Sequence, residues 1–290
     1  MTRSASTQGD EATTAHDLCA LPLVRRLAAM LDRDPAGLRD GDPLPRGWHP
    51  ILFNAATPQS QLRTDGAAQL GVPLPEIGLP RLMLGGRQNR FTGDIPIGAQ
   101  VRRETRHGEV QIKQGRSGRF ALVKVEHRIY VEGASTPVLT EHQDYVLREA
   151  AVAAASTSAS ASQPTSPPAP PNAAVATTAI ATRTILPDER LLFRYSAITD
   201  NPHRIHYDHA YAVDVEGYPG LVVNGSIPTM FLLEMFRATT GHEPVSLSSR
   251  NVAAMFCGQP LHLCIGRDDE GWRLWARNDQ GQITFDARVE

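Results

Sequence analysis

The 290-residue sequence predicts an α+β protein built from two similar halves. In the second half, one long apolar helix-like stretch precedes four strand-like segments joined by turn sequences. In the first half, a helix-like stretch precedes apolar residues that alternate as in an antiparallel meander. Residues 150–182, between the halves, contain no charged or aromatic side chain, which indicates a linker.

The composition excludes several classes of function. The 29 Lys and Arg residues nearly balance the 31 Asp and Glu residues, so no global field favours nucleic acid or an anionic membrane. A hydrophobic content of 41% is enough for real cores, and no apolar run reaches the length of a membrane span. The three cysteines lack the spacing of a disulfide framework or a zinc site. With no signal-like N-terminus, we expect a cytoplasmic protein.

The first half is expected to begin after a disordered polar tail, residues 1–16, and to extend over residues 17–149. Apolar residues at helical spacing predict a helix near residues 17–32. Beyond Gly93, period-two alternation with turns at Gly108 and the "GRSG" sequence predicts strands around Val101, Ile112, Val123 and Ile129.

The second half, residues 183–290, follows the flexible linker predicted over 150–182. A short strand over 182–188 and a short helix around 188–199 lead into a histidine-rich turn. A helix from about Ile227 to Phe236 is apolar almost all round and is therefore expected to be buried, with Gly241 as its end cap. Strands are predicted within 244–256, 259–268, 271–279 and 282–290.

The turn "YSAITDNPHRIHYD", residues 195–208, is the densest group of chemically active side chains. His203, His206 and His209 recur every third residue beside Asp208, and such residues are suitable metal ligands. However, Pro202 and the turn-rich context make a single helical face for them improbable. We therefore expect no metal, and we expect Asp208 to fix the loop through hydrogen bonds to backbone donors.

The order of this turn, the "GYPGLVVNG" sequence, a buried helix and four strands resembles the MaoC-like hot-dog hydratases and dehydratases. The stretches "DPLPRGWHPILFNAATPQSQLRTDG" and "GLPRLMLGGRQNRFTGDIPIG" resemble the double hot-dog subgroup of mitochondrial-type 3-hydroxyacyl-thioester dehydratases and mesaconyl-CoA hydratases. The resemblance implies two long helices, each wrapped by a curved antiparallel sheet, with the first half shaping an acyl pocket and the second carrying the chemistry. It also implies reversible hydration of an enoyl thioester without a cofactor.

The resemblance further implies roles for single residues. His206 matches the family's catalytic histidine, but Asn201 stands where the family usually has a carboxylate. An amide orients water without accepting a proton, so either His206 is the sole acid/base, or Asp200 takes the second role, or the site is impaired. The Gly225 N–H is expected to bind the thioester oxygen at the start of the buried helix. The expected substrate-binding residues are Tyr195, Asn224, Ser226 and Arg250.

Other features leave alternatives open. Arg81, Arg87 and Arg90 form either a patch for the phosphates of coenzyme A or of a carrier-protein phosphopantetheine, or a solvated charged edge. Arg250 is either a ligand for a carboxylate or phosphate or an exposed strand residue. Hot-dog folds also serve thioesterases, and the missing carboxylate is compatible with a non-catalytic acyl-thioester binding protein. The acyl group, the choice between CoA and acyl carrier, and a homodimer stay open.

Overall fold

The computed structural model describes residues 12–54, 56–68, 77–79, 81–115, 118–149 and 177–290. The elements of the first half are β1 (Thr13–Leu18), α1 (Leu21–Met30), β2 (Arg81–Phe91), β3 (Gln100–His107), β4 (Gln111–Gly115), β5 (Gly118–Val131) and β6 (Leu139–Arg148). Those of the second half are β7 (Ala179–Ile185), α2 (Glu189–Ile198), α3 (Ser226–Thr240), β8 (Ser246–Asn251), β9 (Leu261–Asp268), β10 (Gly271–Arg277) and β11 (Ile283–Val289). No helix in these ranges is long and apolar enough to cross a membrane.

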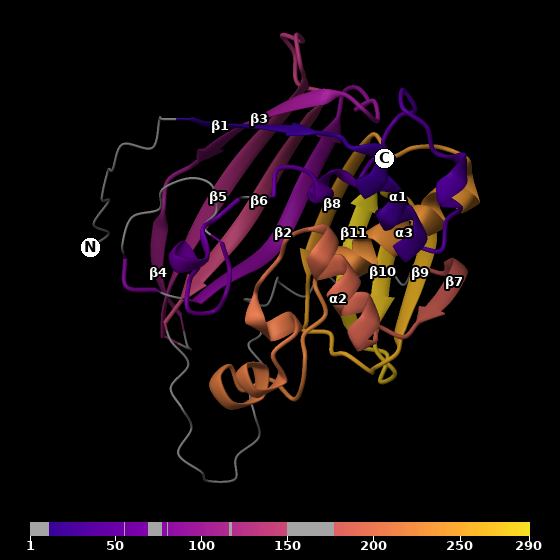
Figure 1. Cartoon of the computed structure of the whole chain (residues 1–290). Coiled ribbons are helices and arrows are strands. Elements are labelled where there is room, and N and C mark those ends of the chain that lie inside the picture. Colours follow the sequence, from indigo (N-terminus) through magenta and orange to yellow (C-terminus); the bar gives the residue numbers. More distant parts are fainter. Residues whose placement is uncertain (1–11, 55, 69–76, 80, 116–117, 150–176) are drawn as a thin grey trace.

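All the strands belong to one antiparallel sheet, ordered β1-β3-β5-β6-β2-β8-β11-β10-β9-β7, with β4 added beside β5. The order within the first half, 1-3-5-6-2, is repeated in the second half as 7-9-10-11-8. The two halves join where β2 pairs with β8, from Gly86 opposite Arg250 to Arg90 opposite Ser246. The chain therefore repeats one antiparallel unit and fuses the two copies edge to edge, as Figure 1 shows.

The second half is built around α3. Its 15 residues are apolar on nearly every side, and the helix is buried against the strands that follow it. The inward side chains of those strands are also apolar, among them Leu263, Leu274 and Phe285. Gly241 ends the helix in a left-handed conformation, with φ of 74° and its N–H bonded to the Arg237 carbonyl, as the sequence predicts.

The first half contains no counterpart of α3 among its described residues. In the repeat, α1 follows β1 as α2 follows β7, so α1 corresponds to α2. Between α1 and β2 the described residues form only three 3-10 turns, Pro35–Gly37, His49–Ile51 and Gln59–Gln61. The described residues of the first half therefore do not include a second long helix of the expected kind, whereas the double hot-dog sheet is present.

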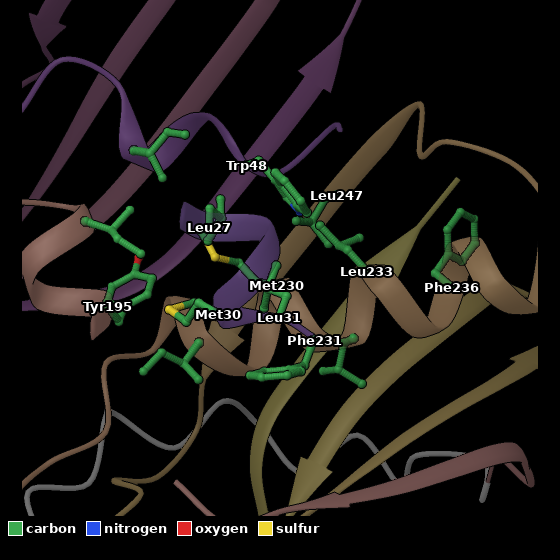
Figure 2. Packing of buried hydrophobic residues seen from close by; sticks show 14 of the residues in the cluster. Leu27, Met30, Leu31, Trp48, Tyr195, Met230, Phe231, Leu233, Phe236 and Leu247 are labelled. Carbon is green, nitrogen blue, oxygen red and sulfur yellow. The ribbon is translucent and has the colours of Figure 1, made fainter. Parts of the chain in front are cut away.

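The three α-helices gather over the second-half strands in Figure 1. α1 contacts α2, and its Leu27, Met30 and Leu31 belong to the same hydrophobic cluster as Met230 and Phe231 of α3 (Figure 2). The fully buried Trp48 joins this cluster, and its Nε1 donates to Glu234 of α3 at 3.0 Å. One hydrophobic core thus fixes the first-half loops against the second half.

Several predicted boundaries need correction. The helix predicted over 17–32 is shorter, because residues 13–18 form β1 instead, and the disordered tail predicted over 1–16 therefore includes four residues of that strand. The linker predicted over 150–182 ends too late, since β7 begins at Ala179; residues 1–11 and 150–176 lie outside the described residues. Strands occur at all the predicted places, but Val123 and Ile129 lie on one strand, β5, and residues 81–91 and 139–148 form strands that had not been predicted.

Candidate active site

A cavity of about 490 Å³ lies between the two halves. Its second-half wall comes from the end of α2, the histidine-rich turn and the start of α3. Its first-half wall comes from β2, β3, β5 and β6 together with the loop that contains His49. Of the predicted site residues, the cavity is lined by His206, Asn201, Gly225, Asn224, Ser226 and Tyr195.

His206 is buried in the cavity wall, with 7% of its surface exposed, at the end of a 3-10 turn from Arg204 to His206. Its Nδ1 lies 2.7 Å from the Val222 carbonyl oxygen. Because a carbonyl oxygen only accepts, Nδ1 carries the proton and the lone pair of the neutral ring is on Nε2. Burial lowers the pKa of His206 to about 4, against the opposing effect of the Val222 hydrogen bond. At neutral pH the ring is therefore an uncharged base.

Backbone pairing holds this histidine turn in place. Val222 returns a hydrogen bond from its own N–H to the Ile205 carbonyl at 2.9 Å. Asp208 accepts from the Tyr211 N–H at 3.0 Å and from the Arg204 guanidinium at 2.8 Å, which confirms the structural role predicted for Asp208. The turn is thus rigid on both sides of the imidazole.

The other two histidines of the turn differ from His206. The His203 ring stands edge-on to the His206 ring, with centroids 5.5 Å apart, and its Nε2 lies 4.0 Å from Asp65 of the first half. His209 is exposed. In the described ranges, no three His, Cys, Asp or Glu side chains are grouped closely enough to hold a metal ion.

The end of α2 positions Asn201. Its N–H bonds to the Ser196 carbonyl, and Asp200 before it has the left-handed φ of 43°, which together make a Schellman-type helix end. The Asn201 Oδ1 accepts from the His203 N–H at 3.2 Å, which orients the amide nitrogen away from that bond. Both Asn201 and Asp200 line the cavity, and Asp200 is the more exposed of the two.

The start of α3 supplies backbone donors to the same cavity. Asn224 Oδ1 accepts from the Ser226 N–H at 3.0 Å, whereas the Gly225 N–H has no acceptor within the described chain. A side chain at Gly225 would meet the Asn251 amide at 2.5 Å, so only glycine allows Asn251 this close. Burial raises the pKa of Tyr195, while a hydrogen bond to Ser226 opposes the shift.

Arg250 is the exception among the predicted site residues. It lies on β8 outside the cavity, its side chain is 57% exposed, and its guanidinium pairs with Asp286 at 3.1 Å. The prediction of Arg250 as a substrate ligand is therefore wrong, because its position on β8 points it to the outer face. Of the arginines considered as a phosphate patch, Arg90 is exposed, Arg81 pairs with Glu216 at 2.6 Å, and Arg87 lies inside the cavity.

The inner face of the first-half sheet carries a polar patch that was not among the predicted site residues. Thr105, His127, Glu141 and Asn89 face one another across β3, β5, β6 and β2, and all four are buried. Beside this row, the cavity wall also contains Arg87, Arg103, Gln143, Tyr145 and His49. The sequence did contain a sign of this patch. Within these strands, the polar residues alternate in step with the buried apolar residues and therefore lie on the same, inner face of the sheet.

Glu141 is the centre of this patch. Its two carboxylate oxygens lie 3.5 Å from Arg87 Nε and from His49 Nε2. Burial works to raise the pKa of Glu141, but Arg87 and His49 outweigh burial and hold that pKa well below its usual range. Burial also lowers the pKa of His127 to about 4, so this histidine is neutral near pH 7.

Comparison with known proteins agrees with this architecture. The family model of hydroxyacyl-thioester dehydratase type 2 matches residues 47–257. The chain is 38% identical over 275 residues to mesaconyl-C(4)-CoA hydratase of Chloroflexus aurantiacus, covering 94% of this chain and 92% of the relative. It is 34% identical over 89 residues, 30% of each chain, to the mitochondrial hydroxyacyl-thioester dehydratase type 2 of Schizosaccharomyces pombe.

Solved structures with the same fold have much lower sequence identity. HtdX of Mycobacterium tuberculosis superimposes with a TM-score of 0.64 at 18% identity, covering 96% of this chain and 99% of the other. A MaoC-like dehydratase of Phytophthora capsici gives 0.66 at 10% identity, covering 97% and 95%. The fold, the matching family model and the extended identity to one relative together show that the chain belongs to the hydroxyacyl-thioester dehydratase type 2 family.

Proposed function

We propose that this protein is a hydro-lyase that adds water to an enoyl thioester, or removes it from a 3-hydroxyacyl thioester, with His206 as the acid/base. The observation that carries the proposal is the neutral His206 ring, whose Nδ1 is fixed on Val222 and which lies in the same cavity as the Gly225 N–H. The names of the two sequence relatives support the same reaction class.

In the hydration direction, His206 Nε2 accepts a proton from water while the water oxygen bonds to the β-carbon of the enoyl group. The electron pair of the double bond moves towards the thioester oxygen, which becomes enolate-like and is stabilised by the Gly225 N–H and the positive end of α3. The protonated imidazole then donates its proton to the α-carbon, which restores the starting enzyme. Every proton in this sequence is accounted for by water and one histidine.

Asn201 has the role of orienting the water in this scheme. Its Oδ1 is bonded to the His203 backbone, so its Nδ2 is the group that donates to the water oxygen. Asp200 sits one residue away on the cavity wall and is the alternative second acid/base.

The test is the rate of hydration by His206→Ala, followed as loss of enoyl-CoA absorbance. We expect a decrease of at least about 100-fold in kcat, the usual scale of a removed general base. His209→Ala is the matched control, because His209 belongs to the same turn but is exposed. Full activity in His206→Ala, with an unchanged fold by circular dichroism, would remove the assignment.

The same assay separates the two alternative functions. Release of free thiol without change at the double bond would identify a thioesterase. Binding of CoA esters with no turnover of any enoyl or hydroxyacyl ester would identify a non-catalytic binding protein.

The relative that matches most of the chain is named for mesaconyl-C(4)-CoA, the thioester of a branched dicarboxylic acid. We propose short enoyl-CoAs, including those with a second carboxylate, as the first substrates to screen. The cytoplasmic location and the homodimer stay predictions.

A further inference from the structure

Arg103 stands out on the inner face of the first-half sheet because its charge has no ion-pair partner within 4.0 Å in the described ranges. It lies on β3, lines the cavity, and has its guanidinium stacked 5.0 Å from the centre of the Phe53 ring. Its Nε is buried and has no hydrogen-bond partner within the described residues. A planar guanidinium held on an aromatic face presents its remaining N–H donors in a fixed fork.

The nearby acidic groups are engaged elsewhere. Glu141 interacts with Arg103 by longer-range electrostatics. Its two oxygens lie 3.5 Å from Arg87 and from His49 instead. Asp17 also acts on Arg103 at longer range, and its two oxygens accept from the Leu18 and Phe53 N–H groups at 2.7 and 2.5 Å. His127 brings no charge near neutral pH. The patch therefore contains the guanidinium groups of Arg87 and Arg103 and the carboxylate of Glu141. This carboxylate lies at ion-pair distance from Arg87 but not from Arg103.

This arrangement is unfavourable for a purely aliphatic acyl chain. Methylene groups packed on Arg103, Arg87 and Glu141 would displace solvent from charged groups without replacing its hydrogen bonds. An anionic group on the acyl chain would instead satisfy Arg103 with charge-assisted bonds that a guanidinium forms in pairs with a carboxylate.

We propose that Arg103 binds a second carboxylate on the acyl group of the substrate, so that the cavity selects thioesters of dicarboxylic acids. Arg87 is a positioning residue in this site: its pair with Glu141 holds the charges around Arg103 in place. The proposal rests on the proposed function for the identity of the thioester, but not on which residue performs the hydration.

The experiment measures binding of saturated CoA esters by calorimetry, because a saturated ester has no double bond to hydrate. Succinyl-, glutaryl- and adipyl-CoA are each compared with the ester of equal carbon number that ends in a methyl group: butyryl-, pentanoyl- and hexanoyl-CoA. For at least one pair we expect the carboxylated ester to bind about 10- to 100-fold more tightly, which is the range of one charged hydrogen-bonded contact. Both members carry the same coenzyme phosphates, so a preference reports on the acyl carboxylate alone.

Three variants assign the preference to a residue. Arg103→Gln should weaken the carboxylated ester about 10- to 100-fold and leave the methyl-ended ester unchanged. Arg103→Lys keeps the positive charge and should retain part of the preference, and its thermal unfolding shows whether the fold survives. Arg90→Gln is the matched control, because Arg90 is an exposed arginine of the same sheet.

Two results would overturn the proposal. One is wild-type protein that binds every methyl-ended ester as tightly as its carboxylated partner. The other is Arg103→Gln weakening both members of a pair equally, which would indicate a structural role. Hydration that survives in His206→Ala would reject the proposed catalyst while leaving these binding results intact.

Discussion

His206 combines a fixed tautomer with a pKa far below that of a solvated imidazole. The Val222 carbonyl sets the tautomer, and burial sets the direction of the pKa shift. In the proposed mechanism, such an imidazole is neutral and able to accept a proton at any pH near neutrality, and its conjugate acid is strong enough to return the proton readily to carbon.

The pH dependence of kcat/KM tests this state of His206. We expect kcat/KM to be flat from about pH 5.5 through neutrality and to fall only as the pH approaches about 4, where the imidazole of the free enzyme takes up a proton. An inflection near pH 6.5, the ordinary imidazole value, would instead point to a solvated histidine as the base.

The same shift predicts the pH dependence of stability. The pKa of His206 is lower in the folded state, so between about pH 6.5 and pH 4 the unfolded chain binds a proton that the native protein does not. The free energy of unfolding should therefore decrease as the pH falls through this window. In His206→Gln the decrease measured by urea unfolding should be smaller, with a remainder from His127, whose pKa is lowered for the same reason.

Substitutions at Asn201 and Asp200 decide between the two roles left open at the end of α2. Asn201→Ala should lower kcat about 10- to 100-fold with little change in KM, since the water loses a donor. Asp200→Asn retains a side chain that tolerates the left-handed backbone, and it should leave kcat nearly unchanged. A large loss in Asp200→Asn with normal activity in Asn201→Ala would reverse the assignment.

At the scale of elements, the two ends of α3 have different roles. Its start lines the cavity, and its far end is capped by Gly241, which contributes to stability. Gly241 has a φ of 74° with open space around its Cα, so Gly241→Ala costs backbone strain of about 1 to 2 kcal/mol and no steric clash. We expect a drop of a few degrees in Tm with unchanged kcat. Gly241→Asn should lower the Tm less than Gly241→Ala, because asparagine tolerates this conformation. An equal decrease in Tm for both variants would mean that backbone strain is not the cause.

The elements of the second half could be predicted well from the sequence because each has a local cause. An all-apolar stretch, a glycine stop and turn sequences between strands suffice to predict α3 and the strands after it. The first half was harder. Its inner strand faces are polar where the second-half ones are apolar, so β2 and β6 do not show hydrophobic alternation.

The site residues also differ in whether local sequence could predict them. His206 and Gly225 lie in a short continuous stretch whose resemblance to a family is specific, and the cavity contains both. The patch around Glu141 and Arg103 depends on the register of four strands spread over more than fifty residues. No local pattern shows that register. The side-chain direction of Arg250 depends on strand pairing in the same way, and Arg250 is the exposed strand residue of the two alternatives considered.

At the scale of the whole molecule, the join between β2 and β8 holds the two halves as one sheet. A side chain at Gly86 would meet the Ser249 carbonyl oxygen at 2.6 Å, across this join. Gly86→Ala should therefore destabilise the protein by about 1 to 3 kcal/mol, as expected of overpacking against the backbone. Gly37→Ala is a suitable control for differential scanning calorimetry, because its nearest contact would be an ordinary 3.9 Å; equal Tm values for the two variants would contradict the argument.

The described residues of the first half contain no counterpart of α3, and this bears on how many ligands one chain is expected to bind. Two identical halves would present two equivalent cavities, each with a helix start on one side and a pocket on the other. Here the half that contains α3 supplies the imidazole and the N–H donor, and the described residues of the first half supply the polar wall. If the proposed function holds, we therefore expect calorimetry to give one bound CoA ester per chain; two equivalent sites per chain would contradict this expectation.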